Sequence, residues 1–331
     1  MVPASHLRAL ADAGLCGLSG PAEAGGAAAP RAVSRLVYET LAGACGVTFF
    51  VWVQHHAPVR MLAASPNAAL GDRWLPALCR GDVLGGVAFA YLRRPGPPAV
   101  AARPTPGGWV VDGEAPWVTS WGLAGLYAVA AAAGDDALFF ALPADPPPPA
   151  VRASPPLALA AMSASATVRL RFDGLFVPAA DVIVTVPLAE WRARDRLATA
   201  QPHPAPLGVA GRAVRLLSDR ARATGQPAVE AAAASLGSEL DACREHAYGL
   251  EAGQGDDAGL ARLVQARAWG LDLASRAALA LVAATGGGAV ALDHPAQRLV
   301  REAAFYSIQA QSLDLRRASL ERLTRRQDPM S

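Results

Sequence analysis

The chain has 331 residues, of which 52% are hydrophobic and 18% charged, a composition typical of a globular protein rather than a disordered or fibrous one. Its formal net charge is only +2, with acidic and basic residues interspersed, so we expect no nucleic-acid partner. All 30 basic residues are arginines, which excludes chemistry that depends on a lysine amine.

The cysteines and the apolar runs bear on the compartment. Cys16, Cys45, Cys79 and Cys243 are widely separated and form no C-x-x-C pair, which favours reduced thiols; we expect no metal site. No signal peptide follows Met1, and the longest apolar runs are shorter than the ~20 residues that a membrane span needs. We therefore expect a soluble, cytoplasmic protein.

Apolar spacing predicts helices in the first quarter of the chain. These helices are expected over residues 4–16, 31–46, 48–64 and 67–80. From Val83 the pattern changes to short runs separated by Gly, Pro and Asp, which predicts strands and a compact β domain. Within the run GGWVVDGE, Asp112-Gly113 predicts the turn of a hairpin.

The last third of the sequence is typical of a helical bundle. Four Ala- and Leu-rich helices are predicted over residues 206–223, 226–250, 257–284 and 295–324. Antiparallel packing would bury their apolar stripes. The expected fold class is α+β in three parts: an N-terminal helical domain (1–82), a central β-barrel-like domain (83–190) and a C-terminal four-helix bundle (191–331).

Five short motifs follow one another along these parts. They are Pro21-Ala22-Glu23-Ala24-Gly25-Gly26; Trp74-Leu75-Pro76 with Gly81-Asp82; Gly113-Glu114-Ala115-Pro116-Trp117-Val118-Thr119-Ser120; Phe172-Asp173 with Val177-Pro178; and Gly286-Gly287 with Arg298 and Arg301-Glu302. Their order and spacing resemble those of the acyl-CoA dehydrogenase family, which has the same three parts. The resemblance covers nearly the whole chain, and it implies that the family's first one or two helices are missing.

The resemblance implies an FAD-dependent oxidoreductase that acts on the CH–CH group of an acyl thioester, as a homodimer or tetramer. It implies an FAD between the β domain and the bundle, contacted by Phe89, Ala90, Tyr91, Trp117, Thr119, Ser120, Gly286 and Gly287. Trp117 offers an apolar ring face, and Thr119 and Ser120 offer short polar donors, which suit a planar, heteroatom-edged flavin. By itself, that run is typical of an ordinary amphipathic strand.

The sequence departs from the family pattern where the reaction needs a base. The family uses a glutamate to remove the α proton of the thioester, and Ala310 stands at the matching position. The family's Thr-Glu-Pro-x-x-Gly-Ser-Asp stretch reads here as residues 91–98, without its Ser-Asp pair. Thr224 replaces a phenylalanine and Ala283 a glutamine that belong to the family's cofactor grip. Together these losses indicate altered or absent dehydrogenation.

Three functions stay open. A dehydrogenase could use Asp195 as a relocated base, although a solvated linker aspartate is the plainer interpretation. A flavin-dependent monooxygenase on the same scaffold would need no such base; His55, His56 and Arg93 are then candidate substrate contacts, against partly exposed helix histidines and a solvated arginine. The third is a non-catalytic subunit that pairs with an active homologue. Glu302 resembles a structural acid and is expected to pair with a bundle arginine.

Overall fold

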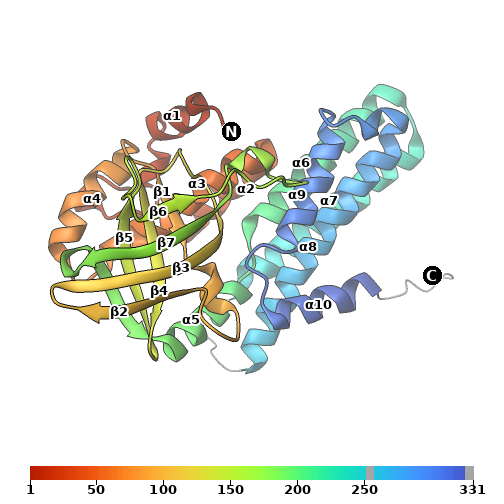
Figure 1. Cartoon of the computed structure of the whole chain (residues 1–331). Coiled ribbons are helices and arrows are strands. Elements are labelled where there is room, and N and C mark those ends of the chain that lie inside the picture. Colours follow the sequence, from red (N-terminus) through yellow and green to blue (C-terminus); the bar gives the residue numbers. More distant parts are fainter. Residues whose placement is uncertain (251–256, 325–331) are drawn as a thin grey trace. The chain divides into compact units, whose positions relative to one another are not determined.

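The computed structural model describes residues 1–250 and 257–324, which form two compact units (Figure 1). The sheet unit contains Met1–Ser34, Val47–Leu159 and Ser163–Arg194. The bundle unit contains Arg35–Gly46, Ala160–Met162 and the chain from Asp195 onward. The N-terminal helices and the strands therefore share one unit, except for most of the second helix, whose residues from Arg35 onward belong to the bundle unit.

The N-terminal helices are α1 (Ala4–Asp12), α2 (Arg31–Ala44), α3 (Gly46–Ala63) and α4 (Ala68–Arg80). They confirm the four predicted helices apart from their ends. Helix α4 shows why its sequence folds this way. The side chain of Asn67 accepts a hydrogen bond from Leu70 N–H at its start, and Gly81 closes it in a left-handed conformation with φ 78°.

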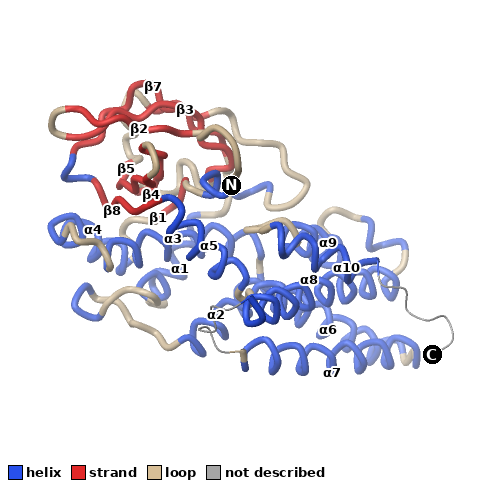
Figure 2. Tube along the Cα trace, turned by 90° about the horizontal axis from the view of Figure 1, so that it is seen from below, coloured by secondary structure: helices blue, strands red, loops and turns tan. Residues whose placement is uncertain are grey.

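The strands form one eight-stranded sheet, as the sequence pattern predicts. They are β1 (Gly85–Ala88), β2 (Val100–Thr105), β3 (Gly108–Val118), β4 (Leu126–Ala133), β5 (Asp136–Pro143), β6 (Val151–Ala153), β7 (Val168–Pro178) and β8 (Val182–Pro187). Their order in space is β6-β7-β3-β2-β4-β5-β8, and β1 pairs with β4 in parallel. Helices α3 and α4 pack next to the strands (Figure 2) and contribute side chains such as Val59 and Leu78 to the same core.

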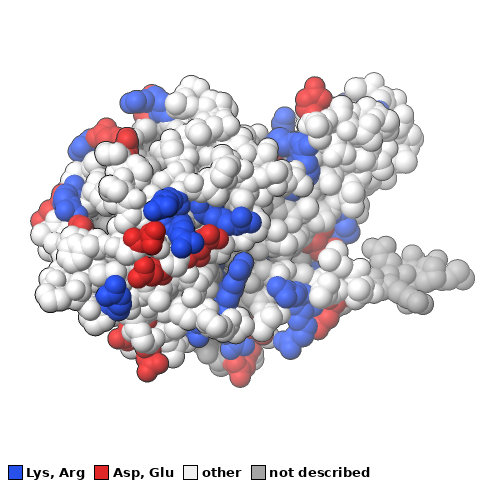
Figure 3. Space-filling view, in the orientation of Figure 1, with Lys and Arg blue, Asp and Glu red and all other residues white. Residues whose placement is uncertain are grey.

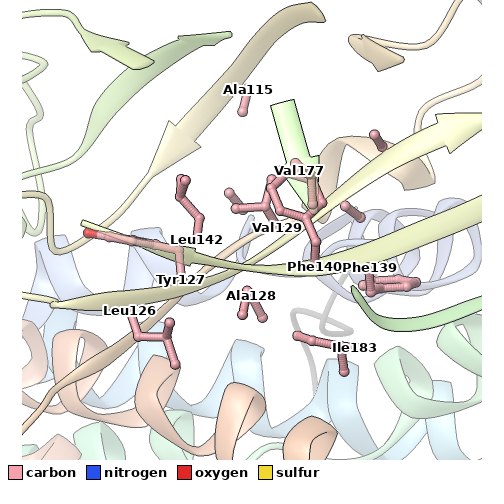
Figure 4. Packing of buried hydrophobic residues seen from close by; sticks show 14 of the residues in the cluster. Ala115, Leu126, Tyr127, Ala128, Val129, Phe139, Phe140, Leu142, Val177 and Ile183 are labelled. Atoms are coloured by element: carbon pink, nitrogen blue, oxygen red, sulfur yellow. The ribbon is translucent and has the colours of Figure 1, made fainter. Parts of the chain in front are cut away.

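Strand β4 lies at the centre of this core. Its first seven residues are all buried, so both of its faces are covered. Figure 4 shows side chains from β4 and β5, with Ala115, Val177 and Ile183 from three other strands, gathered in one apolar interior. The alternation of side chains along β4 therefore supplies both layers of the core.

The predicted hairpin turn at Asp112-Gly113 is wrong. Strands β2 and β3 instead turn at Pro106-Gly107, where Thr105 pairs with Gly108 and Gly107 has φ 79°. Asp112 lies inside β3, and its carboxylate accepts a hydrogen bond from Gly174 N–H at 2.7 Å. Asp112 therefore bonds β3 to β7 instead of forming a turn, because β7 supplies the N–H donor.

Besides most of α2, the bundle unit contains six helices among its described residues. They are α5 (Leu188–Ala200, whose first seven residues belong to the sheet unit), α6 (Pro204–Thr224), α7 (Pro227–Gly249), α8 (Asp257–Thr285), α9 (Pro295–Tyr306) and α10 (Leu313–Thr324). Three of the four predicted bundle helices are confirmed. The fourth, expected over 295–324, is broken by a turn over residues 307–312, in which Ala310 has φ 49°. Helix α5 replaces an expected connection.

Two glycines let α2 and α6 approach closely within the bundle unit. A Cβ added at Gly208 would lie 2.3 Å from the carbonyl oxygen of Glu39, and one added at Gly43 would lie 2.7 Å from that of Gly208. The Glu39 carboxylate also accepts hydrogen bonds from Arg244 at 3.0 Å and from the Tyr248 hydroxyl at 2.6 Å. The end of α2 is therefore fixed to both α6 and α7.

Substituting two glycines of α6 tests this close contact. We expect Gly208→Ala to lower the free energy of unfolding by about 1–3 kcal/mol, because the methyl group would force the helices apart. Gly211→Ala is the matched control, since its Cβ would meet only Leu240 Cδ2 at 3.5 Å. Alanine's better helix propensity should then raise stability by up to about 1 kcal/mol. Equal effects in denaturant unfolding would contradict the close contact.

Candidate functional site

The end of strand β3 has a strained backbone. The β3–β7 register shifts between Ala115 and Val118, and Trp117 takes a left-handed φ of 60° while remaining 57% exposed. Ser120 is also left-handed, with φ 69°. Such conformations cost a non-glycine residue about 1–3 kcal/mol and concentrate at functional sites. The strand end therefore presents an indole ring at the surface of the sheet unit.

Residues 165–167, at the entrance to β7, hold this strand end from the other side. Ser120 N–H donates to the Ser165 carbonyl at 2.9 Å. The Thr119 and Thr167 hydroxyl oxygens lie 3.2 Å apart, and those of Ser165 and Thr167 lie 2.7 Å apart. Tyr127 donates its hydroxyl hydrogen to the Thr119 carbonyl at 3.1 Å. All of these hydroxyl-bearing residues are buried.

Sequence reasoning missed Ser165 and Thr167. Ser165 ends a 3₁₀ turn and Ala166 is left-handed, so no strand or helix periodicity in the sequence places the Ser165 and Thr167 side chains together. Only their placement beside Thr119 shows that they belong to this site.

The hydroxyl oxygen of Ser120 is buried and has no hydrogen-bond partner within residues 1–250 and 257–324. A buried polar atom without a partner is costly and calls for an explanation. A polar group that enters beside Trp117 would supply one. An exposed indole face next to a hydroxyl cluster fits a planar ring with heteroatoms at its edge, so the residues present fit a flavin.

The other predicted cofactor contacts of the sheet unit are mostly used in packing. The Phe89 ring contacts those of Phe139 and Trp191, with centroids 5.8 Å and 6.4 Å away. The Tyr91 hydroxyl bonds to the carbonyls of Ala88, at 2.8 Å, and Ala130, and burial raises the pKa of Tyr91. The side chains of Phe89 and Tyr91 are therefore occupied by contacts within the sheet unit, whereas Ala90 is exposed.

The two candidate substrate histidines are fully buried, so the expectation of partly exposed helix histidines is wrong. Helix α3 is covered on nearly all sides in the sheet unit. His55 donates from Nε2 to the Cys16 carbonyl at 3.0 Å and accepts at Nδ1 from Gly85 N–H at 2.9 Å. His56 contacts the Ser19 hydroxyl through Nδ1 at 3.0 Å. Both nitrogens of His55 are thus occupied by backbone groups, which leaves none for a substrate.

Arg93 ends a short 3₁₀ turn (Ala90–Arg93) and is half-buried. Helix α5 fixes the residues on either side of it. Arg192 donates to the Leu92 carbonyl at 3.0 Å and to the Arg94 carbonyl at 3.4 Å. The position of the Arg93 backbone is therefore defined within the sheet unit.

In the bundle unit, a buried arginine joins Asp195's helix to the turn that contains Ala310. Arg267 donates to the Thr199 carbonyl of α5 and, at 2.9 Å, to the Gln309 carbonyl. An ion pair of 2.9 Å between Arg196 and Asp314 joins α5 to the start of α10, which follows that turn. Asp195 is half-buried and lies in helix α5, which connects the last strand to α6. Ala310 itself carries no group that can accept a proton.

The predicted glycines of the bundle lie in an exposed loop after α8. Gly286 has φ 75° and ψ −153°, a conformation restricted to glycine, and no atom of the described chain would meet a Cβ at Gly286 or Gly287. Val290 and Leu292 of the same loop are 75% and 76% exposed. Arg220 donates to the Ala284 carbonyl, and to that of Thr285 at 3.4 Å, and so caps α8.

The Glu302 carboxylate confirms the expected pairing with a bundle arginine. It lies 3.0 Å from Arg298 and accepts a hydrogen bond from Gly46 N–H at 2.9 Å. Burial raises its pKa, against the lowering effect of Arg298. Glu302 is therefore a structural anchor for the start of α3 rather than a group open to a substrate.

The remaining features of the described chain do not depend on the predicted site residues. A cavity of about 270 Å³ in the bundle unit is bounded by α8, the turn over residues 307–312 and α10. Within the described residues, no three His, Cys, Asp or Glu side chains lie close enough to hold a metal ion, and no helix has the length and hydropathy needed to cross a membrane. On the face drawn in Figure 3, basic and acidic side chains lie beside one another.

Comparison with known proteins agrees with this architecture. Residues 1–82 match the family model for "Acyl-CoA dehydrogenase, N-terminal domain". The solved structure of butyryl-CoA dehydrogenase from Megasphaera elsdenii superposes with a TM-score of 0.78 at 18% identity, covering 96% of this chain and 89% of that one. Residues 1–82 are therefore similar to the N-terminal domain of acyl-CoA dehydrogenases, and the chain as a whole has the acyl-CoA dehydrogenase fold.

The chain is also similar to proteins whose names indicate different reactions. Benzylmalonyl-CoA dehydrogenase of Aromatoleum aromaticum is 26% identical over 180 residues, an alignment that covers 53% of this chain and 48% of that protein. The chain thus matches about half the length of this curated relative. The 3-HSA hydroxylase of Rhodococcus sp. RHA1 shares the fold, with a TM-score of 0.77 at 19% identity over 96% of this chain and 88% of that one.

The buried histidines of α3 predict acid sensitivity. Burial lowers the pKa of His55 from 6.5 to about 4. Because the unfolded chain takes up the proton first, this contribution to stability is complete above pH 6.5 and is lost as the pH falls to about 4. We expect a loss of roughly 3 kcal/mol in the free energy of unfolding across this range. Denaturant unfolding at a series of pH values measures it.

The variant His55→Gln attributes the effect. It should be less stable at pH 7 but lose less stability on acidification than the original protein. An identical pH dependence in the two proteins would show that His55 is not responsible.

Proposed function

We propose that the chain binds FAD at the end of β3 and acts as an FAD-dependent oxidoreductase on an acyl thioester, carried by CoA or by an acyl carrier. The observation that carries this proposal is the strand end itself. An exposed Trp117 in a left-handed conformation stands beside the buried, partnerless hydroxyl of Ser120. Strain and an unmade hydrogen bond both persist where a ligand compensates them.

Each residue of the strand end has a part in this proposal. Trp117 would cover one face of the ring system, and Thr119 and Ser120 would bond to its polar edge. The backbone around Ala90 would complete the contact from the sheet unit. When bound, FAD supplies a hydride acceptor for the C–H bond that the reaction breaks.

The exposed glycine loop after α8 supports a role in assembly. Gly286 and Gly287 are not needed for packing within the described chain, and the loop also exposes Val290 and Leu292. We propose that a second copy of the chain, or a homologue, covers this loop. The backbone of the loop would then approach the cofactor of the neighbouring subunit closely.

For proton removal we propose Asp195. Asp195 is half-buried on α5. Arg267 ties this helix to the turn where the family carries its glutamate, and the Arg196–Asp314 pair ties it to α10. The α proton of a thioester is only weakly acidic, so the reaction needs such a base. The alanine at position 310 favours one second candidate, a non-catalytic subunit that pairs with an active homologue.

FAD binding is the first test. The purified protein should be yellow, and FAD added to the stripped protein should raise its melting temperature. The replacement Trp117→Ala should weaken FAD binding, because it removes the stacking surface, whereas Trp109→Ala on the same strand should not. A colourless protein that FAD does not stabilise would exclude both flavin-dependent functions.

The base is tested by anaerobic mixing of the flavin-loaded protein with a panel of saturated acyl-CoA thioesters. Loss of the flavin's visible absorbance reports reduction. We expect Asp195→Asn to slow it by ~10²–10⁴-fold, with Asp241→Asn, exposed on α7, as the control. Adding Ala310→Glu to the Asp195→Asn variant should restore reduction.

Other outcomes of this experiment separate the alternatives. Reduction that survives Asp195→Asn would exclude Asp195 as the base. Reduction that appears only after Ala310→Glu would show that the natural chain lacks a base, as a non-catalytic subunit would. Reduction by NAD(P)H and a reductase, without any by acyl-CoA, would support oxygenation instead.

A further inference from the structure

We propose that Ser165 and Thr167 are positioning residues that set Thr119 as a hydrogen-bond donor toward the bound flavin. This inference rests on the proposed FAD site. It adds two residues from the entrance to β7 that none of the comparisons assigns to the site. Their side chains form a chain of three hydroxyl groups, Ser165–Thr167–Thr119, with oxygen separations of 2.7 Å and 3.2 Å.

The number of hydrogens limits how this chain can be ordered. Each hydroxyl has one hydrogen to donate. In one order, Ser165 donates to Thr167, Thr167 donates to Thr119, and the hydrogen of Thr119 remains for an outside acceptor. In a second order, Thr119 donates to Thr167 and Thr167 to Ser165, so the hydrogen of Ser165 is the one left over. In a third, Thr119 and Ser165 both donate to Thr167, whose own hydrogen is then left over at a buried residue.

The surroundings of the left-over hydrogen distinguish these orders, because Thr119 lies two residues from the exposed Trp117 whereas Ser165 is 0% exposed. Within the described part of the chain, the Ser165 hydroxyl has Thr167 as its partner. The second order, like the third, would therefore leave a buried donor without an acceptor, which is costly. The first order leaves the unused hydrogen on Thr119, two residues from the exposed Trp117. The geometry thus favours Thr119 as a donor, which suits the unprotonated nitrogen and carbonyl oxygens of an oxidised flavin ring.

The backbone around these residues is held as tightly as the side chains. Ala166, between the two positioning residues, is left-handed with φ 51°, and its carbonyl accepts from Trp121 N–H at 3.2 Å. Tyr127 fixes the Thr119 carbonyl at 3.1 Å. Thr119 is therefore restrained at both its backbone and its hydroxyl, as a residue that must aim one hydrogen requires.

The test compares four variants for FAD affinity and for the visible absorbance spectrum of bound FAD. Thr167→Val keeps the side-chain shape but removes the middle hydroxyl. We expect roughly 3- to 10-fold weaker FAD binding and a shifted absorbance maximum, since hydrogen bonds to the ring tune the flavin's electronics. Ser165→Ala should shift both readouts in the same direction by less. Thr167→Ser should restore values near those of the original protein.

Thr185→Val, on the exposed side of β8, is the matched control and should change neither readout. Melting temperatures of the stripped proteins show whether each variant folds. If Thr167→Val does not fold, Ser165→Ala tests the positioning role instead. If the original protein binds FAD but Thr167→Val and Ser165→Ala bind it with unchanged affinity and spectrum, the positioning role is overturned and the proposed function stands. If the original protein binds no FAD, both are overturned.

Discussion

The burial of strand β4 on both faces is the constraint on which the sheet unit depends. Seven successive buried residues cannot be covered by one neighbouring layer, so other strands and the helices α3 and α4 must close over both faces. Its small alanine side chains let these layers come close. Strand β3, which pairs with β2 on one edge, pairs with β7 on the other until the register shifts between Ala115 and Val118. Trp117 lies within this shift, where the unpaired backbone can take a left-handed conformation and turn the indole outward.

In the bundle unit, the buried charges of Arg267 and Glu302 hold the segments in place. Burying an ion is costly unless several groups compensate it, and removing one partner costs more than the pair contributes. Arg267 is compensated by backbone carbonyls of α5 and of the turn before α10, and Glu302 by Arg298 and the start of α3. These contacts fix where the chain bends. They therefore position the turn that contains Ala310 and the helix that contains Asp195.

The fold does not decide the reaction. Acyl-CoA dehydrogenases and a hydroxylase superpose on this chain almost equally well, at identities that establish the scaffold alone. The proposed function therefore rests on local features: an exposed indole on a strained strand end, a hydroxyl without a partner among the described residues, and a chain of three hydroxyl groups. The histidines of α3 show the converse. They looked suited to a substrate pocket, but burial and backbone partners give His55 a structural role.

The sequence by itself determined the helix and strand segments, the family resemblance and the absence of a carboxylate at position 310, because these follow from local periodicity, turn residues and residue identity. It could not place Asp112-Gly113, break the last helix or reveal the role of Ser165 and Thr167. Each of those depends on a partner distant in sequence: Gly174 for Asp112, Arg267 for the turn at Gln309, and Thr119 for Thr167. Local propensity sets what a segment can form, and long-range hydrogen bonds and burial decide which form is stable.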